Sequence, residues 1–225
     1  MLPASTARPV TTIISPEDLR GWIVRDDGDL VVVNKPPNVL CHPSKNGPWS
    51  SLIGACREYF GVERLHMPSR LDRETSGVVC FARSAELGSR LVVAVEDGGY
   101  PAETRFDVLE ARGGFTLARV TPLTGRLHQI RVHAAWLGAP LAGDKLYGPD
   151  STLFLEFVER GFTDRLAAAL AHPRQALHAS RLEFDLAEGP LLLDAPLADD
   201  LAGFCRTRMG IERERLERLL TGALA

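Results

Sequence analysis

Apolar residues along this chain recur either at every one or two positions or at every three or four positions. Segments of the two kinds follow one another without a regular repeat. Short apolar or alternating runs predict strands over residues 30–33, 77–82, 92–95, 104–109, 115–120, 177–184 and 191–193. Apolar residues three or four positions apart predict helices over residues 15–21, 51–60, 85–91, 126–138, 154–161, 165–170, 198–204 and 211–220. Because strands and helices intermix without an ordered β–α–β alternation, we expect an α+β fold. Its mixed, mainly antiparallel central sheet would be flanked by helices and loops.

Capping and turn residues fix several of these boundaries. Ser15 and Pro16 occupy the N-cap and the first helical position, which are places that serine and proline favour. The two prolines at 36–37 end the first strand, because proline cannot donate to a strand ladder. Gly113-Gly114 joins two strands as a hairpin, and Thr124 is expected to cap the helix that follows.

The length of 225 residues allows one large domain. We divide the chain into an N-terminal arm over residues 1–22 and one domain over residues 23–225 that includes the C-terminal helices. No apolar run approaches the roughly 18 residues of a membrane span. Residues 1–10 also lack the apolar core of a secretory signal. We therefore expect a cytoplasmic monomer without membrane contact.

Composition narrows the choice of partners only slightly. A formal net charge of −3 argues mildly against broad nucleic-acid binding. Charge can segregate, however, and several of the 23 arginines cluster inside the motifs described below. The four cysteines are scattered without a CxxC pair, and their spacing indicates neither a disulfide framework nor a cysteine zinc site. We expect four reduced, buried thiols.

The densest polar motif is residues 70–77, which read Arg-Leu-Asp-Arg-Glu-Thr-Ser-Gly. Arg70 and Arg73 flank Asp72, and neighbouring guanidinium groups favour an ionised carboxylate. An ionised and oriented carboxylate can act as a nucleophile at a sugar carbon. The simpler alternative is a surface ion pair. We favour a site, because the motif leads directly into a buried strand, where active-site loops tend to lie.

A second polar motif covers residues 124–133, which read Thr-Gly-Arg-Leu-His-Gln-Ile-Arg-Val-His. If a helix begins near Arg126, its first backbone N–H groups form an anion site and Arg126 can reach a phosphate. His128 and Arg131 then share one face at i, i+3, with Arg131 placed to reach Asp72. A histidine that only caps the helix is the alternative for His128.

These motifs resemble those of the RluA-type RNA pseudouridine synthases. The family patterns are approximately His-Arg-Leu-Asp-Arg-Asp-Thr-Ser-Gly and Thr-Gly-Arg-x-His-Gln-Ile-Arg-Val-His. The resemblance continues through Gly143-Asp144 and through the Leu-His-Ala run that begins at Leu177. It also includes the opening strand, where Asn38 stands in place of a family glycine. Together these motifs cover roughly residues 23–185 and imply the pseudouridine synthase fold.

The resemblance implies isomerisation of uridine to pseudouridine in structured RNA, either rRNA or tRNA, without a cofactor or metal. Asp72 would be the nucleophile, and Arg131 would hold it. A uridine inside a stack would have to be flipped out to reach them. The residues implied to contact the substrate are Arg70, Arg73, Arg126, His128, Gln129, Leu91, Tyr147 and Leu177.

The chain departs from the family pattern between residues 83 and 104, where the path is shorter. Our alignment places Leu91 at the family's tyrosine, and Tyr100 lies nearby in the sequence. Two alternatives therefore stay open. One is a catalytically impaired family member that binds RNA. The other is a glycoside hydrolase that uses Asp72 with Glu74.

Overall fold

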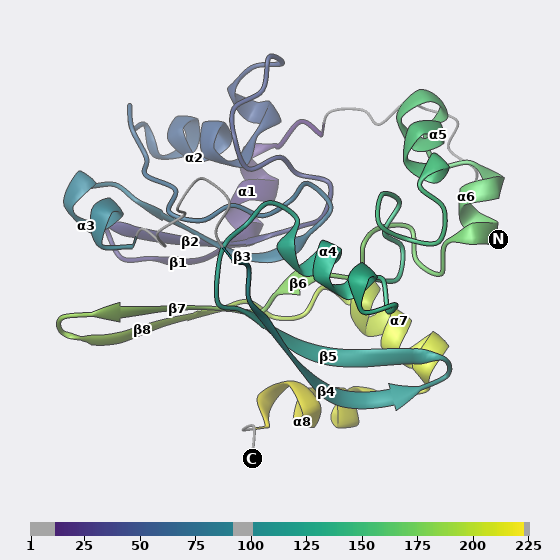
Figure 1. Cartoon of the computed structure of the whole chain (residues 1–225). Coiled ribbons are helices and arrows are strands. Elements are labelled where there is room, and N and C mark those ends of the chain that lie inside the picture. Colours follow the sequence, from purple (N-terminus) through teal and green to yellow (C-terminus); the bar gives the residue numbers. More distant parts are fainter. Residues whose placement is uncertain (1–11, 92–100, 223–225) are drawn as a thin grey trace.

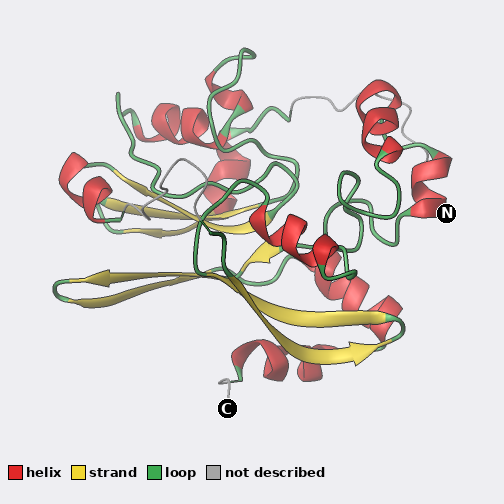
Figure 2. Ribbon diagram, viewed as in Figure 1, coloured by secondary structure: helices red, strands yellow, loops and turns green. Residues whose placement is uncertain are grey.

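The computed structural model describes residues 12–91 and 101–222, and it has the α+β architecture that the sequence predicted (Figures 1 and 2). The helices are α1 Pro16–Trp22, η1 Pro48–Ser50, α2 Leu52–Phe60, α3 Ala85–Arg90, α4 Gln129–Trp136, α5 Thr152–Arg160, α6 Asp164–Ala169, α7 Asp199–Met209 and α8 Arg213–Thr221. The strands are β1 Ile23–Asp26, β2 Leu30–Lys35, β3 Ser76–Ala82, β4 Thr104–Arg112, β5 Phe115–Pro122, β6 His178–Ala179, β7 Arg181–Leu186 and β8 Gly189–Asp194. The strand expected over 92–95 lies outside the described residues.

The central sheet has the order β1-β2-β3-β6 and explains the unbroken apolar runs in the sequence. Strands β1, β2 and β3 pair antiparallel, and β6 adds to β3 in parallel. On one face, Val31, Val33 and Val79 pack in a cluster with residues of α1 and α2. On the other face, Val32 and Val78 pack in a cluster with residues of the β7–β8 hairpin, which crosses beneath the sheet (Figure 1). Since both faces are covered, β2 and β3 need apolar residues at nearly every position.

The start of the described chain belongs to this core. Ser15 caps α1 as predicted, because its side chain accepts a hydrogen bond of 3.0 Å from the backbone N–H of Asp18. Ile14 and Leu19 are fully buried in the same cluster as the sheet residues. Helix α1, which falls in the range expected to be an arm, therefore packs as an integral layer of the domain.

Two further hairpins extend from this core. β4 and β5 pair antiparallel with the turn at Gly113-Gly114, as predicted. Helices α7 and α8 form a separate apolar cluster with Phe115 of β5. The single strand expected over 177–184 was wrong, because it is divided into β6 and β7. β6 pairs in parallel with the start of β3, and β7 turns away to pair with β8.

Gly77 permits the close contact between β3 and β6. This contact separates β6 from β7 in the segment that was expected to form one strand. The φ of Gly77 is 120°, and a Cβ at this position would lie 2.2 Å from the backbone oxygen of Ala179. Only glycine allows that approach. The sequence Leu-His-Ala can therefore join the central sheet at the point where the loop containing Asp72 enters it.

The four cysteines are free and buried, as expected. Burial in the core raises the pKa of the Cys56 and Cys80 thiols to about 12. Along the part of the chain that the structure describes, no helix is both long enough and apolar enough to cross a bilayer.

Asn38 adopts the left-handed backbone that its place in the motif predicted, with φ of 67°. We expect Asn38→Ala to lower the free energy of unfolding by about 1 kcal/mol, because alanine tolerates this conformation poorly. Asn38→Gly should keep or raise stability, since glycine adopts positive φ without strain. Urea denaturation measures both. The side chain is exposed, so neither change opens a cavity. Equal midpoints for the two variants would contradict this interpretation.

Candidate active site

Asp72 lies in the loop that leads into β3, at the mouth of the strand as the sequence predicted. The backbone N–H of Thr75 donates to the Asp72 carbonyl at 3.1 Å and closes a turn around the residue. Thr75 is buried, whereas the Asp72 side chain is 26% exposed. The carboxylate is thus fixed to the core by its backbone and remains open to a ligand.

Three side chains from two segments converge on one oxygen of Asp72. Arg131 on α4 donates from Nη1 to Oδ2 at 3.0 Å, and Gln175 donates from Nε2 to the same oxygen at 3.3 Å. His128 places Nε2 3.7 Å from Oδ2. All three contacts fall on Oδ2, and none of them involves Oδ1.

Arg131 is itself aimed by a buried ion pair. Its Nε and Nη2 donate to the two carboxylate oxygens of Asp144 at 2.7 and 2.9 Å. The side chains of Arg131 and Asp144 are only 9% and 0% exposed. Asp144 also accepts from the backbone N–H groups of Leu146 and Tyr147, each at 3.0 Å. The turn at Asp144 therefore orients the arginine.

Both members of this pair stay charged near neutral pH. Burial lowers the pKa of Arg131, but hydrogen bonds and charge from Asp144 and Asp72 outweigh it and raise the pKa above its ordinary value. Burial raises the pKa of Asp144, but the Arg131 guanidinium and two backbone N–H groups outweigh it and lower the pKa. A bidentate arginine held in this way presents its third nitrogen to Asp72 in a fixed direction.

His128 reaches Asp72 by a route that the sequence did not predict. Helix α4 begins at Gln129, three residues after the expected start near Arg126, and His128 precedes it with φ of 53° and ψ of 19°. The expected i, i+3 helical face shared by His128 and Arg131 was therefore wrong. A left-handed residue, not a helical turn, directs the imidazole towards Asp72. Leu127, which directly precedes His128, is 80% exposed.

Gln129 holds the loop together and has no bonding capacity left for a substrate. Its Oε1 accepts from the Thr124 hydroxyl and from the backbone N–H of Arg126, at 2.7 and 3.0 Å. Its Nε2 donates to the Glu103 carbonyl and to the Thr104 hydroxyl, at 2.8 and 2.9 Å. All four positions of the amide are filled, and the residue is buried. Substrate contact by Gln129 is thus corrected to a structural role. Thr124 serves this network and does not cap α4.

Leu91, expected in the uracil pocket, is 0% exposed. It packs in the cluster that contains Val32, Val78 and Phe184 on one face of the central sheet. A side chain without accessible surface cannot contact a base, so this expectation is corrected as well. Tyr100 lies outside the described residues.

The remaining predicted residues differ in their exposure. The Arg70 side chain is exposed, and those of Arg73, Arg126 and Leu177 are partly buried. The Arg73 carbonyl accepts from Nζ of the fully buried Lys35 at 3.2 Å, which anchors the Asp72 loop to β2. Two of the motif arginines therefore belong to the same short loop as Asp72, and Arg126 belongs to the loop before α4.

Gln175 is the contact to Asp72 that sequence reasoning missed. It is buried, and its Nε2 also donates to the Thr75 hydroxyl at 2.7 Å. Its neighbour Arg174 donates to the Glu74 carbonyl at 3.1 Å and pairs with Asp200 on α7 through Nε at 2.6 Å. An Arg-Gln pair one residue before the Leu-His-Ala run was the available signal. Its spacing alone does not show that it folds back onto the Asp72 loop.

Tyr147 completes the cluster. Its hydroxyl lies 3.2 Å from His128 Nδ1, and the two rings meet edge to face. The Arg131 guanidinium carbon lies 5.1 Å from the Tyr147 ring centroid, within the range of a cation–π contact. Tyr147 thus contacts both residues that approach Asp72 from the α4 side.

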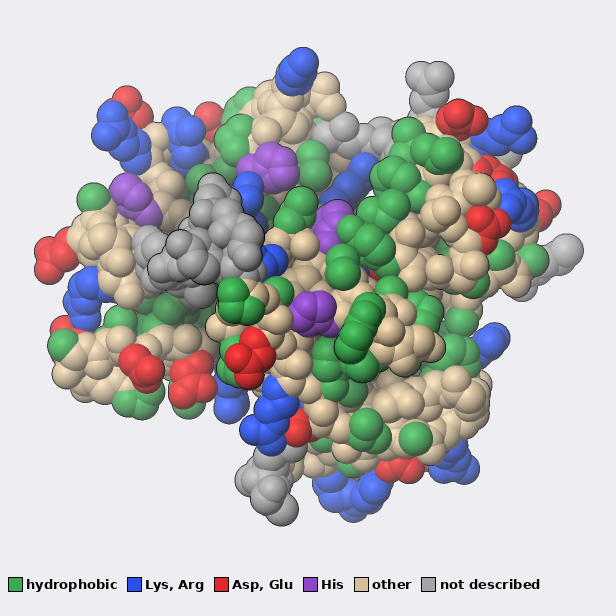
Figure 3. Space-filling model, in the orientation of Figure 1, with side chains coloured by type: hydrophobic (Ala, Val, Ile, Leu, Met, Phe, Trp, Pro, Cys, Tyr) green, Lys and Arg blue, Asp and Glu red, His purple; other side chains and the backbone are tan. Residues whose placement is uncertain are grey.

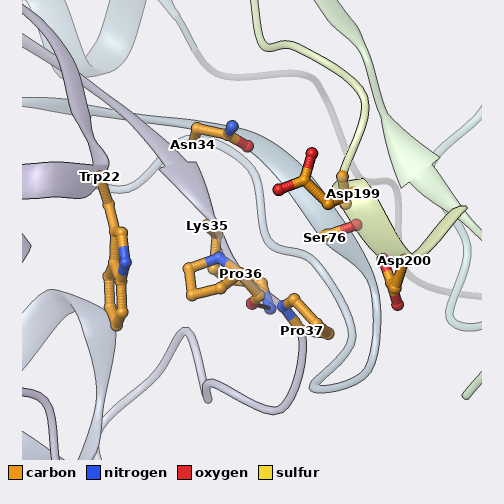
Figure 4. A pocket seen from close by; sticks show the side chains of 9 residues that line it. Trp22, Asn34, Lys35, Pro36, Pro37, Ser76, Asp199 and Asp200 are labelled. Carbon is orange, nitrogen blue, oxygen red and sulfur yellow. Dashed lines mark hydrogen bonds between the residues drawn. The ribbon is translucent and has the colours of Figure 1, made fainter. Parts of the chain in front are cut away.

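The face of the molecule in Figure 3 shows histidine and basic side chains among hydrophobic ones near its centre. A separate hollow of about 390 Å³ is lined by Trp22, Lys35, Pro37, Ser76 and Asp199 (Figure 4). Neither Asp72 nor Arg131 lines it. We therefore locate the candidate site at Asp72 and not in this hollow.

Comparison with known proteins adds independent information. The RNA pseudouridylate synthase family matches residues 29–95 and 89–136. Ribosomal large subunit pseudouridine synthase D of Xanthomonas campestris is 30% identical over 236 residues, covering 84% of this chain and 70% of its own length. The protein of the same name from Nitrosomonas europaea is 30% identical, covering 88% and 68%. The aligned region is 236 residues long, which is more than 84% of the 225 residues of this chain. The Xanthomonas protein therefore contains residues within this region that have no counterpart here.

Solved structures agree on the fold. Human RNA pseudouridylate synthase domain containing 4 superposes with a TM-score of 0.62 at 22% identity, covering 85% of this chain and 94% of that one. Human RNA pseudouridylate synthase domain containing 1 gives a TM-score of 0.57 at 21% identity, covering 99% and 98%. The fold, the motifs around Asp72 and Arg131 and the extent of the sequence matches all agree. The chain belongs to the RluA-type family of RNA pseudouridine synthases.

Proposed function

We propose that this protein isomerises uridine to pseudouridine in structured RNA, with Asp72 as the nucleophile. The observation that carries the proposal is the Asp72 carboxylate, which is held through Oδ2 by Arg131 and Gln175 while Oδ1 takes no contact from these residues. A partly exposed carboxylate that is held through one of its two oxygens is suited to attack at C1′ of a ribose. Membership of the family supplies the reaction.

The reaction rearranges bonds within one nucleotide. Attack at C1′, or assistance to the departing base, breaks the C1′–N1 bond while the uracil stays in the site. The base then turns, C5 forms the new bond to C1′, C5 loses its proton and N1 gains one. Atoms and electrons balance without an added reagent, so the chemistry needs only positioned groups and a base. The target nucleotide must leave its stack to reach Asp72.

The arginines of the two motif loops are suited to hold the RNA backbone. Arg70 and Arg73 flank Asp72, and Arg126 precedes α4 in the loop that carries His128. Guanidinium groups bind phosphate with bidentate geometry, and such contacts position a nucleic acid without reading its sequence. Local arginines therefore compensate for a chain that is acidic overall.

Ribosomal RNA is our proposal for the substrate, because the relatives from Xanthomonas and Nitrosomonas are named ribosomal large subunit pseudouridine synthases. Transfer RNA is the alternative substrate. We also propose that the protein acts in the cytoplasm as a monomer.

The glycoside hydrolase alternative is weakened by the surroundings of Glu74. Its carboxylate accepts from Lys145 Nζ at 2.7 Å, and Lys145 is buried between Glu74 and the Pro173 carbonyl. A carboxylate committed to a buried cation is poorly placed to act as the second acid or base of a hydrolase. We assign this ion pair to the support of the Asp72 loop.

The direct test is release of tritium from RNA that carries 5-³H-uridine. Ribosomal RNA and bulk tRNA, prepared separately without modification, are incubated with the purified protein. We expect label to be released from rRNA, and chemical mapping of the product should show one or more defined uridines. Release of tritium from tRNA but not from rRNA would identify tRNA as the substrate. Salt-sensitive RNA binding without release from either would favour the RNA-binding alternative.

A further inference from the structure

Formation of pseudouridine requires a base that no residue assigned above supplies. After C5 has bonded to C1′, that carbon carries both the sugar and its original hydrogen, and the ring regains its double bond only when the proton leaves. Asp72 has left C1′ by then, and an ionised carboxylate is a weaker base than a neutral imidazole. The base must lie within hydrogen-bond reach of the uracil, close to the carboxylate that binds the ribose.

The three side chains on Asp72 differ in their ability to accept a proton. Arg131 is a guanidinium without an acceptor, and the Gln175 amide nitrogen that faces Asp72 is a donor. His128 presents an imidazole nitrogen, which is a proton acceptor when neutral. Its Nε2 lies 3.7 Å from Oδ2, beyond hydrogen-bond distance, so the ring is near the carboxylate without being bonded to it.

The second nitrogen of His128 is already occupied. Nδ1 lies 3.2 Å from the Tyr147 hydroxyl oxygen. Tyr147 is in turn held by its backbone N–H on Asp144 and by its ring against Arg131. If Nδ1 carries the proton and donates to Tyr147, the lone pair of Nε2 faces the site. A tyrosine hydroxyl can accept this proton, and in that tautomer Nε2 is the nitrogen that can act as a base.

The backbone at His128 supports a role beyond capping. It is one of two non-glycine residues with positive φ in the described part of the chain, and its side chain makes no capping hydrogen bond to α4. Its left-handed conformation costs free energy that a helical residue would not incur. That conformation is also what brings the imidazole towards Asp72.

We infer that His128 is the base that removes the C5 proton and that Tyr147 positions it; this role rests on the proposed isomerisation. The C5–H bond breaks and its proton passes to Nε2. Its electron pair forms the C5–C6 double bond, and the electrons of the C6–N1 double bond return to N1, which takes up a proton. The imidazolium releases its proton to water or to N1.

The decisive variant is His128→Gly, because glycine accepts the left-handed backbone and leaves a space in which free imidazole can bind. We expect a fall in the rate of tritium release of about 10²–10⁴-fold, the usual contribution of a general base. Added imidazole should restore part of the rate, with substituted imidazoles ranked by their basicity. Deuterium at C5 should slow the variant more than it slows the wild type, because proton removal becomes rate-limiting.

Three further variants separate catalysis from structure. Leu127→Gly makes the same change at the adjacent, exposed residue and should keep its rate. His128→Asn keeps a side chain that tolerates positive φ and should be as slow as His128→Gly without rescue. Tyr147→Phe should slow the reaction roughly tenfold, the value of one hydrogen bond. Thermal denaturation of each variant confirms that it is folded.

The outcomes are distinguishable. A slow His128→Gly enzyme with rescue and a larger isotope effect supports the inference. Loss of rate without rescue and without a change in isotope effect would show that His128 only positions other groups, and the inference would fall. A wild-type protein that releases no tritium from any RNA would remove the proposed function, and this role with it.

Discussion

Asp72→Asn should abolish isomerisation while RNA binding persists. We expect tritium release from 5-³H-uridine RNA to fall by at least about 10⁴-fold, as when the nucleophile of another enzyme is removed. An amide is a far weaker nucleophile than a carboxylate, yet it has the same shape. Its oxygen can still accept from Arg131, which donates to Oδ2 at 3.0 Å in the wild type. The fold and the phosphate contacts should therefore survive.

The matched control is Asp185→Asn, which makes the same chemical change on an exposed residue of the β7–β8 hairpin. It should release tritium at the wild-type rate. Filter binding at low salt compares the RNA affinity of the two variants and the wild type. If the activity of Asp72→Asn were within tenfold of the wild-type activity, Asp72 would not be the nucleophile. Equal loss of binding and activity would instead assign Asp72 to RNA recognition.

Local signals were sufficient to predict most elements of the fold. The cap at Ser15, the apolar runs of β2 and β3 and the turn at Gly113-Gly114 each depend on a few adjacent residues. Their free energies are largely determined by neighbours in the sequence, so the pattern identifies them. The same holds for Asn38, whose positive φ follows from its place in a tight turn.

Predictions failed where a residue's environment is set by distant segments. Leu91 was assigned by alignment to the uracil pocket, but the cluster around β2, β3 and β7 buries it completely. The helix expected from Arg126 begins only at Gln129. The side-chain oxygen of Gln129 accepts from Thr124 and from the Arg126 backbone N–H and holds the preceding loop in a non-helical form. Periodicity carries no information about such side-chain hydrogen bonds.

In the site, too, residues with a local sequence motif were predicted, and a residue placed by a distant segment was missed. Asp72 and Arg131 were identified from their motifs, and the structure brings them to 3.0 Å across 59 positions of sequence. Gln175 was missed because its contact with Asp72 spans 103 positions and depends on the parallel pairing of β6 with β3. A residue whose role depends on a fold-back of this length carries no local signature.

Asp144→Ala should have the largest effect on stability. Arg131 and Asp144 form a bidentate pair with side chains 9% and 0% exposed, so removing the carboxylate leaves a buried guanidinium with only Asp72 as its counter-charge. Breaking one partner of a buried pair costs about 3–5 kcal/mol of unfolding free energy. Urea denaturation at neutral pH measures the loss. Activity should also fall, because Arg131 is no longer aimed at Asp72.

Asp194→Ala is the control, since Asp194 pairs with Arg181 on the surface, where the two side chains are 57% and 56% exposed. An exposed pair of this kind contributes at most about 1 kcal/mol. Similar losses in the two variants would show that burial does not govern the strength of the Arg131–Asp144 pair. A loss confined to Asp144→Ala, accompanied by lower activity, would connect the buried pair to the geometry of the site.

The pH dependence of this difference provides a second, independent measurement. The pKa of Asp144 in the folded protein is lowered from 3.8, because hydrogen bonds to Arg131 and to two backbone N–H groups outweigh burial. A lowered folded pKa means that the carboxylate contributes its full stability above the unfolded value. That contribution is lost as the pH falls from the unfolded value through the folded one. The stability gap between wild type and Asp144→Ala should therefore be constant from pH 7 to about 5 and then narrow with further acidification. A gap that stays constant down to pH 3 would mean that the carboxylate charge is not what holds Arg131 in place.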